Sequence, residues 1–132
     1  MADIDIEVTL RGGELEGGSR CYEPGSMVQG WLRLTPREDV KCDRVLVRLE
    51  WHTEGRGDGD RDCVAEIGLA VAGLTADTSV IRDFNLTLPK DPWSYAGHYI
   101  NVIWEVIVVL DISFARDVIR KEQIVVVPQR AS

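Results

Sequence analysis

The sequence predicts an all-β chain that folds as a sandwich of two antiparallel sheets. Apolar residues recur at every second position through most of the chain, and turn-forming residues interrupt the pattern about every ten residues. One stretch, from Tyr99 to Leu110, is apolar at nearly every position. Alternation is typical of half-buried strands, whereas a nearly continuous apolar strand needs cover on both faces. Regular short strands with Gly/Pro turns favour a sandwich.

Each predicted element follows from its local pattern. Ile, Val and Leu alternate with polar residues over 3–10, and the pairs Gly12-Gly13 and Gly17-Gly18 then bracket a turn region. Residues 22–26 are a turn, because proline presets φ and glycine supplies a positive φ. The later strands are predicted at 27–35, 44–52, 63–71, 80–88, 98–112 and 121–128. Two connections separate them: an exposed hairpin loop of glycine and charge at 54–62, and a connector at 113–120 with at most one helical turn.

Length and charge limit the classes of function. The 132 residues suit one domain, residues 1–132, and the formal charge of −7 argues against binding to a nucleic-acid backbone. The first residues have no basic and apolar signal segment, and the long apolar stretch is interrupted by Asn101, Glu105 and Asp111. A secretory signal and a transmembrane helix are therefore not expected, and a cytoplasmic protein is predicted. The odd number of cysteines, Cys21, Cys42 and Cys63, predicts reduced thiols.

The loop Asp58–Asp62 is the clearest candidate for a metal site. Its alternate carboxylates resemble the start of a calcium loop, but the sixth position is Cys63 and the twelfth is Leu69, where glycine and glutamate are needed. A solvated hairpin tip is therefore the favoured explanation of these charges, and a different calcium site that includes Glu54 remains open.

Catalytic motifs are absent from the sequence. It has no G-x-S-x-G, no HExxH and no phosphate-binding glycine loop, and its two histidines, His52 and His98, lie far apart. Nucleophilic catalysis needs a nucleophile, a base and an orienting group in one pocket, and a sandwich fills its interior with side chains. We therefore expect no enzyme activity and no cofactor.

Apolar residues at strand positions that point away from the core predict a protein interface, a single apolar patch around Met27, Trp31, Ile103 and Ile107. Met27 and Trp31 lie on the polar face of their strand, and Ile103 and Ile107 lie on the second face of the long strand. This second face is either covered by the 113–120 connector or offered to a partner, a second copy included. An uncharged strand at 124–127 could also accept a partner's strand at its edge. The candidate interface residues are Met27, Trp31, Ile103, Ile107, Ile124 and Val126.

Several motifs together resemble the N-terminal domains of arrestin-like proteins. The motifs are Tyr22-x-Pro24-Gly25-x-x-Val28-x-Gly30, Phe84-x-Leu86-x-Leu88-Pro89, Ser94-Tyr95-x-Gly97 and Trp104-x-Val106. The tail, from Val109-Leu110-Asp111-Ile112 to Val125-Val126-Val127-Pro128, is most similar to the microbial sporulation-control arrestin-like proteins. In this motif set Gly30 is expected to let the early hairpin bend, and Ser94 and Tyr95 to satisfy backbone groups at a turn.

The resemblance implies an immunoglobulin-like sandwich that binds other proteins as a scaffold and performs no chemistry. Arrestins usually contain two such sandwiches, and this chain has room for one, so self-association could replace the missing half. Receptor and phosphate recognition are not implied, because the basic features that serve them are not visible. Three other functions stay open: a ligand-binding module, an enzyme built from dispersed His, Asp and Cys residues, and a structural subunit of a larger assembly. The ligand-binding module would use Trp31, Trp51 or Trp93 as a platform for sugars, or the Asp58–Asp62 loop for calcium.

Overall fold

The computed structural model describes residues 3–56, 59–71, 73–97 and 100–128, and these form strands and loops without a helix. No part of the described chain therefore provides a helix able to cross a membrane. The strands are β1 (Ile4–Arg11), β2 (Glu14–Glu16), β3 (Ser19–Tyr22), β4 (Met27–Pro36), β5 (Cys42–Gly55), β6 (Arg61–Leu69), β7 (Val80–Thr87), β8 (Tyr95–Ala96), β9 (Ile100–Ile112) and β10 (Val118–Val126).

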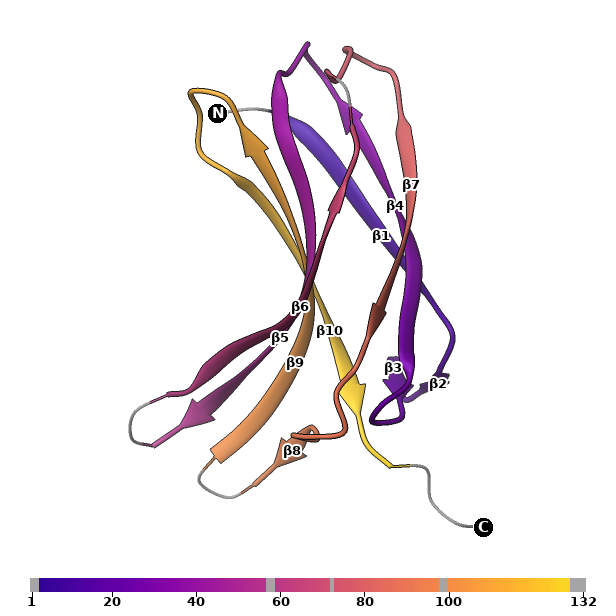
Figure 1. The fold of residues 1–132 in the computed structure, drawn as a ribbon, viewed down its shortest axis with the longest axis vertical. Coiled ribbons are helices and arrows are strands. Elements are labelled where there is room, and N and C mark those ends of the chain that lie inside the picture. Colours follow the sequence, from indigo (N-terminus) through magenta and orange to yellow (C-terminus); the bar gives the residue numbers. More distant parts are fainter. Residues whose placement is uncertain (1–2, 57–58, 72, 98–99, 129–132) are drawn as a thin grey trace.

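The strands form two sheets that face each other (Figure 1). The small sheet has the order β1-β4-β7, and the large sheet has the order β2-β3-β10-β9-β5-β6, with β8 paired to β9. This arrangement confirms the predicted all-β sandwich. One pair differs from the antiparallel prediction, because β3 meets the end of β10 in parallel, with Val125 and Val126 opposite Cys21 and Tyr22.

The core lies between the sheets and is built on the even-numbered side chains of β9. Trp104, Val106, Val108 and Leu110 are fully buried there, and Val28, Leu32 and Leu34 of β4 face them from the small sheet. Burying the Trp104 ring also requires a partner for its polar edge, and Nε1 donates to the Pro92 carbonyl at 3.1 Å. One face of β9 is buried against the small sheet, and side chains of neighbouring strands cover much of its other face. This burial on both faces explains why the segment is apolar at nearly every position.

Three short strands are not predicted by the sequence. β2 and β3 form a hairpin within the glycine-rich turn region, and β8 precedes the long strand. The 113–120 connector, for which the sequence allows at most one helical turn, contains none: the segment is a hairpin turn, and β10 already begins at Val118. Phe114 at the tip of this turn has a φ of 60° and a fully exposed side chain.

Ser94 supports the end of β10, which agrees with its predicted role in satisfying backbone groups. Its backbone N–H donates to the Val126 carbonyl at 2.7 Å, and its Oγ accepts from the Val126 N–H at 2.9 Å. Tyr95 differs, because its side chain is mostly exposed. The serine thus closes the backbone hydrogen bonds of a strand end that lies 32 residues further along the chain.

Gly30 has a different role from the one that the sequence predicts. It lies in the middle of β4 rather than at a bend, between β1 and the ring of Phe84. A Cβ atom at this position would lie 2.3 Å from the Thr9 carbonyl oxygen and 2.9 Å from the Phe84 ring. The glycine is therefore required by close packing.

We expect Gly30→Ala to lower the free energy of unfolding by about 1–3 kcal/mol, because the new methyl group overpacks the small sheet. Gly68→Ala is the matched control, since a Cβ there meets only the Leu46 side chain at 3.9 Å. Urea unfolding of both variants measures the difference. Equal stability of the two variants would contradict the packing argument.

Candidate protein-binding surfaces

The four apolar residues predicted as one patch lie on opposite sides of the molecule. Met27 and Trp31 point outward from the small sheet, whose core-facing residues are the even-numbered ones of β4. Ile103 and Ile107 point outward from the large sheet, away from the core-facing residues of β9. The prediction of a single patch is wrong, because alternation within a strand does not say which sheet the strand joins. Met27 and Trp31 remain predicted interface residues.

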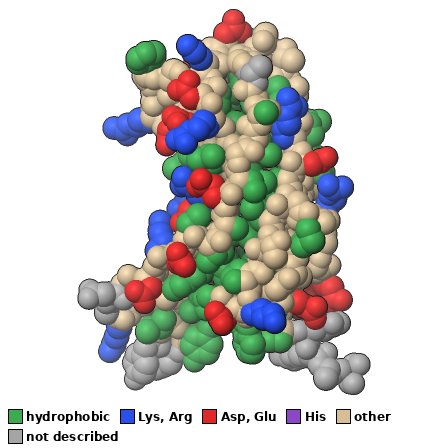
Figure 2. All heavy atoms as spheres, in the orientation of Figure 1, with side chains coloured by type: hydrophobic (Ala, Val, Ile, Leu, Met, Phe, Trp, Pro, Cys, Tyr) green, Lys and Arg blue, Asp and Glu red, His purple; other side chains and the backbone are tan. Residues whose placement is uncertain are grey.

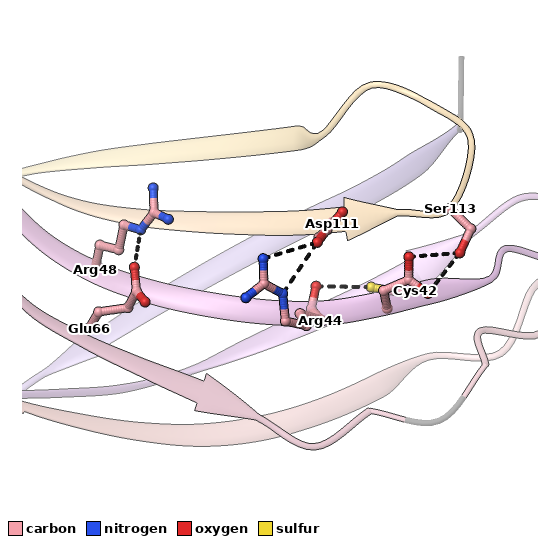
Figure 3. Close-up of polar contacts among 7 residues, drawn as sticks. Cys42, Arg44, Arg48, Glu66, Asp111 and Ser113 are labelled. Carbon is pink, nitrogen blue, oxygen red and sulfur yellow. Dashed lines mark hydrogen bonds and ion pairs between the residues drawn. The ribbon is translucent and has the colours of Figure 1, made fainter.

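The centre of the outer face of the large sheet is closed by side chains of the same chain, whereas Ile119 of β10, opposite Val109, is 54% exposed. Leu46, Ile107 and Val109 form a small cluster at the centre and are 8%, 5% and 4% exposed. Figure 3 shows the ion pairs that border this cluster, Arg44 with Asp111 at 3.2 Å and Arg48 with Glu66. Arg48 lies directly opposite Ile107 in the sheet, and long charged side chains cover apolar neighbours with their aliphatic parts. Ile107 is therefore not the exposed contact that the sequence predicts, and Ile103 is half-buried beside His52.

Ile124 and Val126 are core residues, with exposures of 1% and 0%. The backbone beside them is also occupied, because β3 pairs with Val125 and Val126, and Ser94 binds both polar groups of Val126. The prediction that 124–127 offers a free edge is therefore wrong. A short apolar strand without charge has the same pattern in a core as at an open edge.

The remaining candidate binding surfaces are the open sides of strands. Two of these strands carry charged residues at positions whose side chains point toward the core. β3 pairs only with Val125 and Val126 of β10, so the earlier part of β10 is open on the side away from β9 in the described structure. There the side chains of Arg120 and Glu122 point toward the core side and form an ion pair of 2.9 Å. On β7 Arg82 takes such a position, and its guanidinium donates to the carbonyls of Ala70 and Ile81. Inward-pointing charges are a common way to prevent a strand from adding to an edge.

The other edges of the large sheet are also poor templates. β2 contains three residues, Glu14–Glu16, and all of them are exposed. β6 pairs with β5 through a shift in register between Leu49 and Glu50, and it lies beside β7, whose Arg82 binds the Ala70 carbonyl. Short length and irregular register both limit strand addition.

β1 differs from all of these edges. Its core-facing side chains are Ile4, Ile6, Val8 and Leu10, with no charge among them, and each is only partly buried. Within the described residues, β1 pairs along one side alone, with β4. The partial burial agrees with this open side: β10 of the large sheet approaches β1, but within the described residues no strand pairs with β1 there.

The backbone groups of β1 that face the open side can be assigned from two hydrogen bonds. Arg37 N–H donates to the Asp3 carbonyl at 2.9 Å, and Leu88 N–H donates to the Ser26 carbonyl at 2.8 Å. Hydrogen-bonded pairs alternate along an antiparallel ladder, so odd residues of β1 bond to β4. The N–H and C=O groups of Ile6 and Val8 therefore point to the open edge.

A cleft of about 740 Å³ lies at the end of the sandwich, between the β2–β3 hairpin, the start of β4 and the segment after β10. Its described lining contains Glu14, Glu16 and Glu23 but no lysine, arginine or histidine. Burial and the neighbouring carboxylates of Glu16 and Glu14 raise the pKa of its one thiol, Cys21. A protonated thiol beside carboxylates is a poor nucleophile, so the lining lacks an activated nucleophile with a base.

The other titratable candidates do not assemble a reactive group either. His52 faces two carboxylates, with Nε2 2.9 Å from Glu54 and Nδ1 3.2 Å from Glu105, and His98 lies outside the described residues. In the predicted calcium loop Asp58 is likewise outside them, and the Asp60 carbonyl accepts from Thr53 N–H. Across the described part of the chain no three His, Cys, Asp or Glu side chains converge as metal ligands.

All three cysteines are free thiols, but they differ in exposure: Cys42 is buried, Cys21 is intermediate and Cys63 is exposed. The pKa of each thiol is raised, in each case mainly by burial, and for Cys63 the carboxylates of Glu50 and Glu66 add to this effect. No disulfide joins the three cysteines, and their reduced state stays a prediction.

Comparison with known proteins identifies the architecture. The crystal structure of Spo0M, a sporulation control protein from Bacillus subtilis, matches 96% of this chain with a TM-score of 0.73 and 18% sequence identity. The chain has the arrestin-like fold. It spans 50% of the Spo0M chain, and at this identity the likeness concerns the fold alone. No protein-family model matches the sequence, and no curated protein matches it.

We expect alkylation of Cys63 by iodoacetamide to be slow near neutral pH and to reach its plateau at a higher pH than alkylation of an unperturbed cysteine in a short peptide, because only the thiolate reacts and the pKa of Cys63 is raised. Glu50→Gln should shift this profile to lower pH, since removing a negative charge opposite Cys63 lowers the thiol pKa. Glu54→Gln, which removes a carboxylate that faces His52, is the control. Peptide-level mass spectrometry measures the rates, and a plateau reached at or below the pH at which the reference peptide reaches its own plateau would contradict the raised pKa.

Proposed function

We propose that this chain is a non-enzymatic, arrestin-like protein-binding module that accepts an extended segment on the free edge of β1. The observation that supports the proposal is the contrast among the edges. The other edges are protected against strand addition by charged residues at core-facing positions, by a register shift or by short length. β1 is regular and eight residues long, and its core-facing positions are all apolar.

The binding mechanism is strand addition. A partner strand would pair with the outward N–H and C=O groups of Ile6 and Val8, which provide affinity without a deep pocket. Its side chains on the core side would cover the half-buried Ile4, Ile6 and Val8 and remove apolar surface from water. Its other side chains would lie beside the acidic and polar outer face of β1, where Asp5, Glu7 and Thr9 alternate.

A scaffold role in the cytoplasm is the wider form of the proposal. The arrestin-like fold supports it, because the resemblance implies binding without chemistry, and the free cysteines are compatible with a reducing compartment. The formal charge of −7 adds a preference for neutral or basic partners.

We expect Val8→Pro to abolish binding of extended peptides, because proline removes an N–H that faces the open edge without removing a bond to β4. Ile81→Pro is the matched control, since the outward edge of β7 is already blocked by Arg82. Peptides selected from a displayed random library by the wild-type chain serve as probes, and fluorescence anisotropy measures their affinity for each variant.

The location of the bound peptide completes the test. Binding should protect the amides of Ile6 and Val8 from hydrogen exchange, and thermal melting should show that both proline variants remain folded. Peptides that bind Val8→Pro as tightly as wild type, or that protect another edge, would overturn the proposal.

A further inference from the structure

We propose that the occupant of the β1 edge is β1 of a second copy of this chain, paired antiparallel about a two-fold axis through Val8. This inference rests on the strand-addition site proposed above and names its partner. A two-fold axis makes such an interface self-complementary, so each contact occurs twice.

The direction of the free backbone groups defines the registers that are allowed. Even residues of β1 point their N–H and C=O groups to the open edge, so even residues must lie opposite even residues of the partner strand. With Val8 opposite Val8, Ile6 lies opposite Leu10 on the core side. The core-facing side chains of the two copies then form one continuous apolar row.

The same register brings opposite charges together on the outer side. Asp5 lies opposite Arg11 of the second copy, and by symmetry Arg11 lies opposite its Asp5, while Glu7 lies opposite Thr9. Directly opposed cross-strand pairs of opposite charge are stabilising, and like charges are destabilising. The sequence of β1 is therefore complementary to itself in this register.

Neighbouring registers are less favourable. A shift by two residues in one direction places Glu7 opposite Glu7, which sets two carboxylates against each other. A shift by two in the other direction pairs Glu7 with Arg11, but it leaves Asp5 opposite Gly13, which lies beyond the end of β1, and so shortens the overlap. The register centred on Val8 combines pairs of opposite charge with the longer overlap and no opposed carboxylates.

Side chains on the neighbouring strands extend this charge pattern. Asp5 is 3.2 Å from Arg37, and Arg11 is 3.7 Å from Asp83. Asp5 and Arg11 side chains are each 57% exposed, so each retains room for a second partner. In the paired form the charges would alternate along a row of Arg37, Asp5, the second copy's Arg11 and its Asp83. Networks of this kind hold charged side chains better than isolated surface pairs.

Self-pairing would also remove open sheet edges. The joined β1 strands would turn two three-stranded sheets into one continuous sheet, and the free edge of each copy would be paired.

Charge reversal tests the register directly. We expect the wild-type chain to form a dimer in sedimentation velocity, and Asp5→Arg or Arg11→Asp alone to weaken it by about tenfold, because each places two like-charge pairs in the interface. A mixture of the two variants should recover the dimer. In the mixed pair, the arginine introduced at position 5 faces the aspartate introduced at position 11, and the unchanged Arg11 faces the unchanged Asp5. Asp62→Arg and Arg61→Asp on β6 are controls with the same changes in net charge.

The outcomes separate this inference from the proposed function. A wild-type chain that stays monomeric at high concentration, a dimer that persists in Val8→Pro, or a mixture that stays monomeric would overturn self-pairing. Peptide binding that depends on Val8 in a strictly monomeric chain would retain strand addition with a different partner. Melting temperatures of both single variants close to wild type would show that the mixing result reports pairing rather than unfolding.

Discussion

Alternation with a period of two residues is the constraint on which this structure depends. Along a strand, the side-chain direction and the hydrogen-bonding direction both alternate, so fixing one residue fixes the rest. The even side chains of β9 and β4 form the core, and the pairing of β4 with β1 then fixes the even residues of β1. Their side chains face the core, while their N–H and C=O groups point within the sheet toward its open edge, away from β4. The apolar row and the unpaired edge of β1 thus have one origin.

The same alternation explains why some open strands carry charged residues at core-facing positions and β1 does not. A charge in the core-facing phase is costly in a closed sandwich and tolerable at an open side, where it reaches water. Arg82 on β7 and the Arg120–Glu122 pair on β10 occupy such positions. In Figure 2 a band of hydrophobic side chains runs along the face between the two sheets, with charged side chains on either side of it. On this face the apolar band is bordered by charge, whereas the core-facing side chains of β1 include no charged residue.

Much of the fold can be predicted from the sequence, because long strands show their period clearly. The alternation in 3–10 and the continuous run in β9 identify half-buried and covered strands without other information. β2, β3 and β8 escape prediction, since two to four residues cannot display a period. The parallel contact of β3 with β10 escapes it as well, because it joins segments about a hundred residues apart and no local signal records it.

The candidate site is less predictable, because sequence periodicity gives the face of a strand but not its sheet or its neighbours. For this reason the sequence groups Trp31 with Ile107 although they lie on opposite outer faces, and it suggests a free edge at Ile124 although β10 ends in the core. The sequence does contain a feature that distinguishes β1 as an open edge. The positions of β1 whose side chains point to the core contain no charged residue, whereas the corresponding positions of β10 contain Arg120 and Glu122. Only the strand pairing, which the sequence does not reveal, shows that both strands have an open side and that the contrast therefore concerns binding.

Residue-level hydrogen exchange along β1, followed by NMR as a function of protein concentration, tests the account most directly. In dilute solution the amides of Ile6 and Val8 should exchange rapidly and those of Glu7 and Thr9 slowly, and rising concentration should protect Ile6 and Val8. Equal protection of neighbouring amides in dilute solution, or an alternation that concentration leaves unchanged, would contradict it.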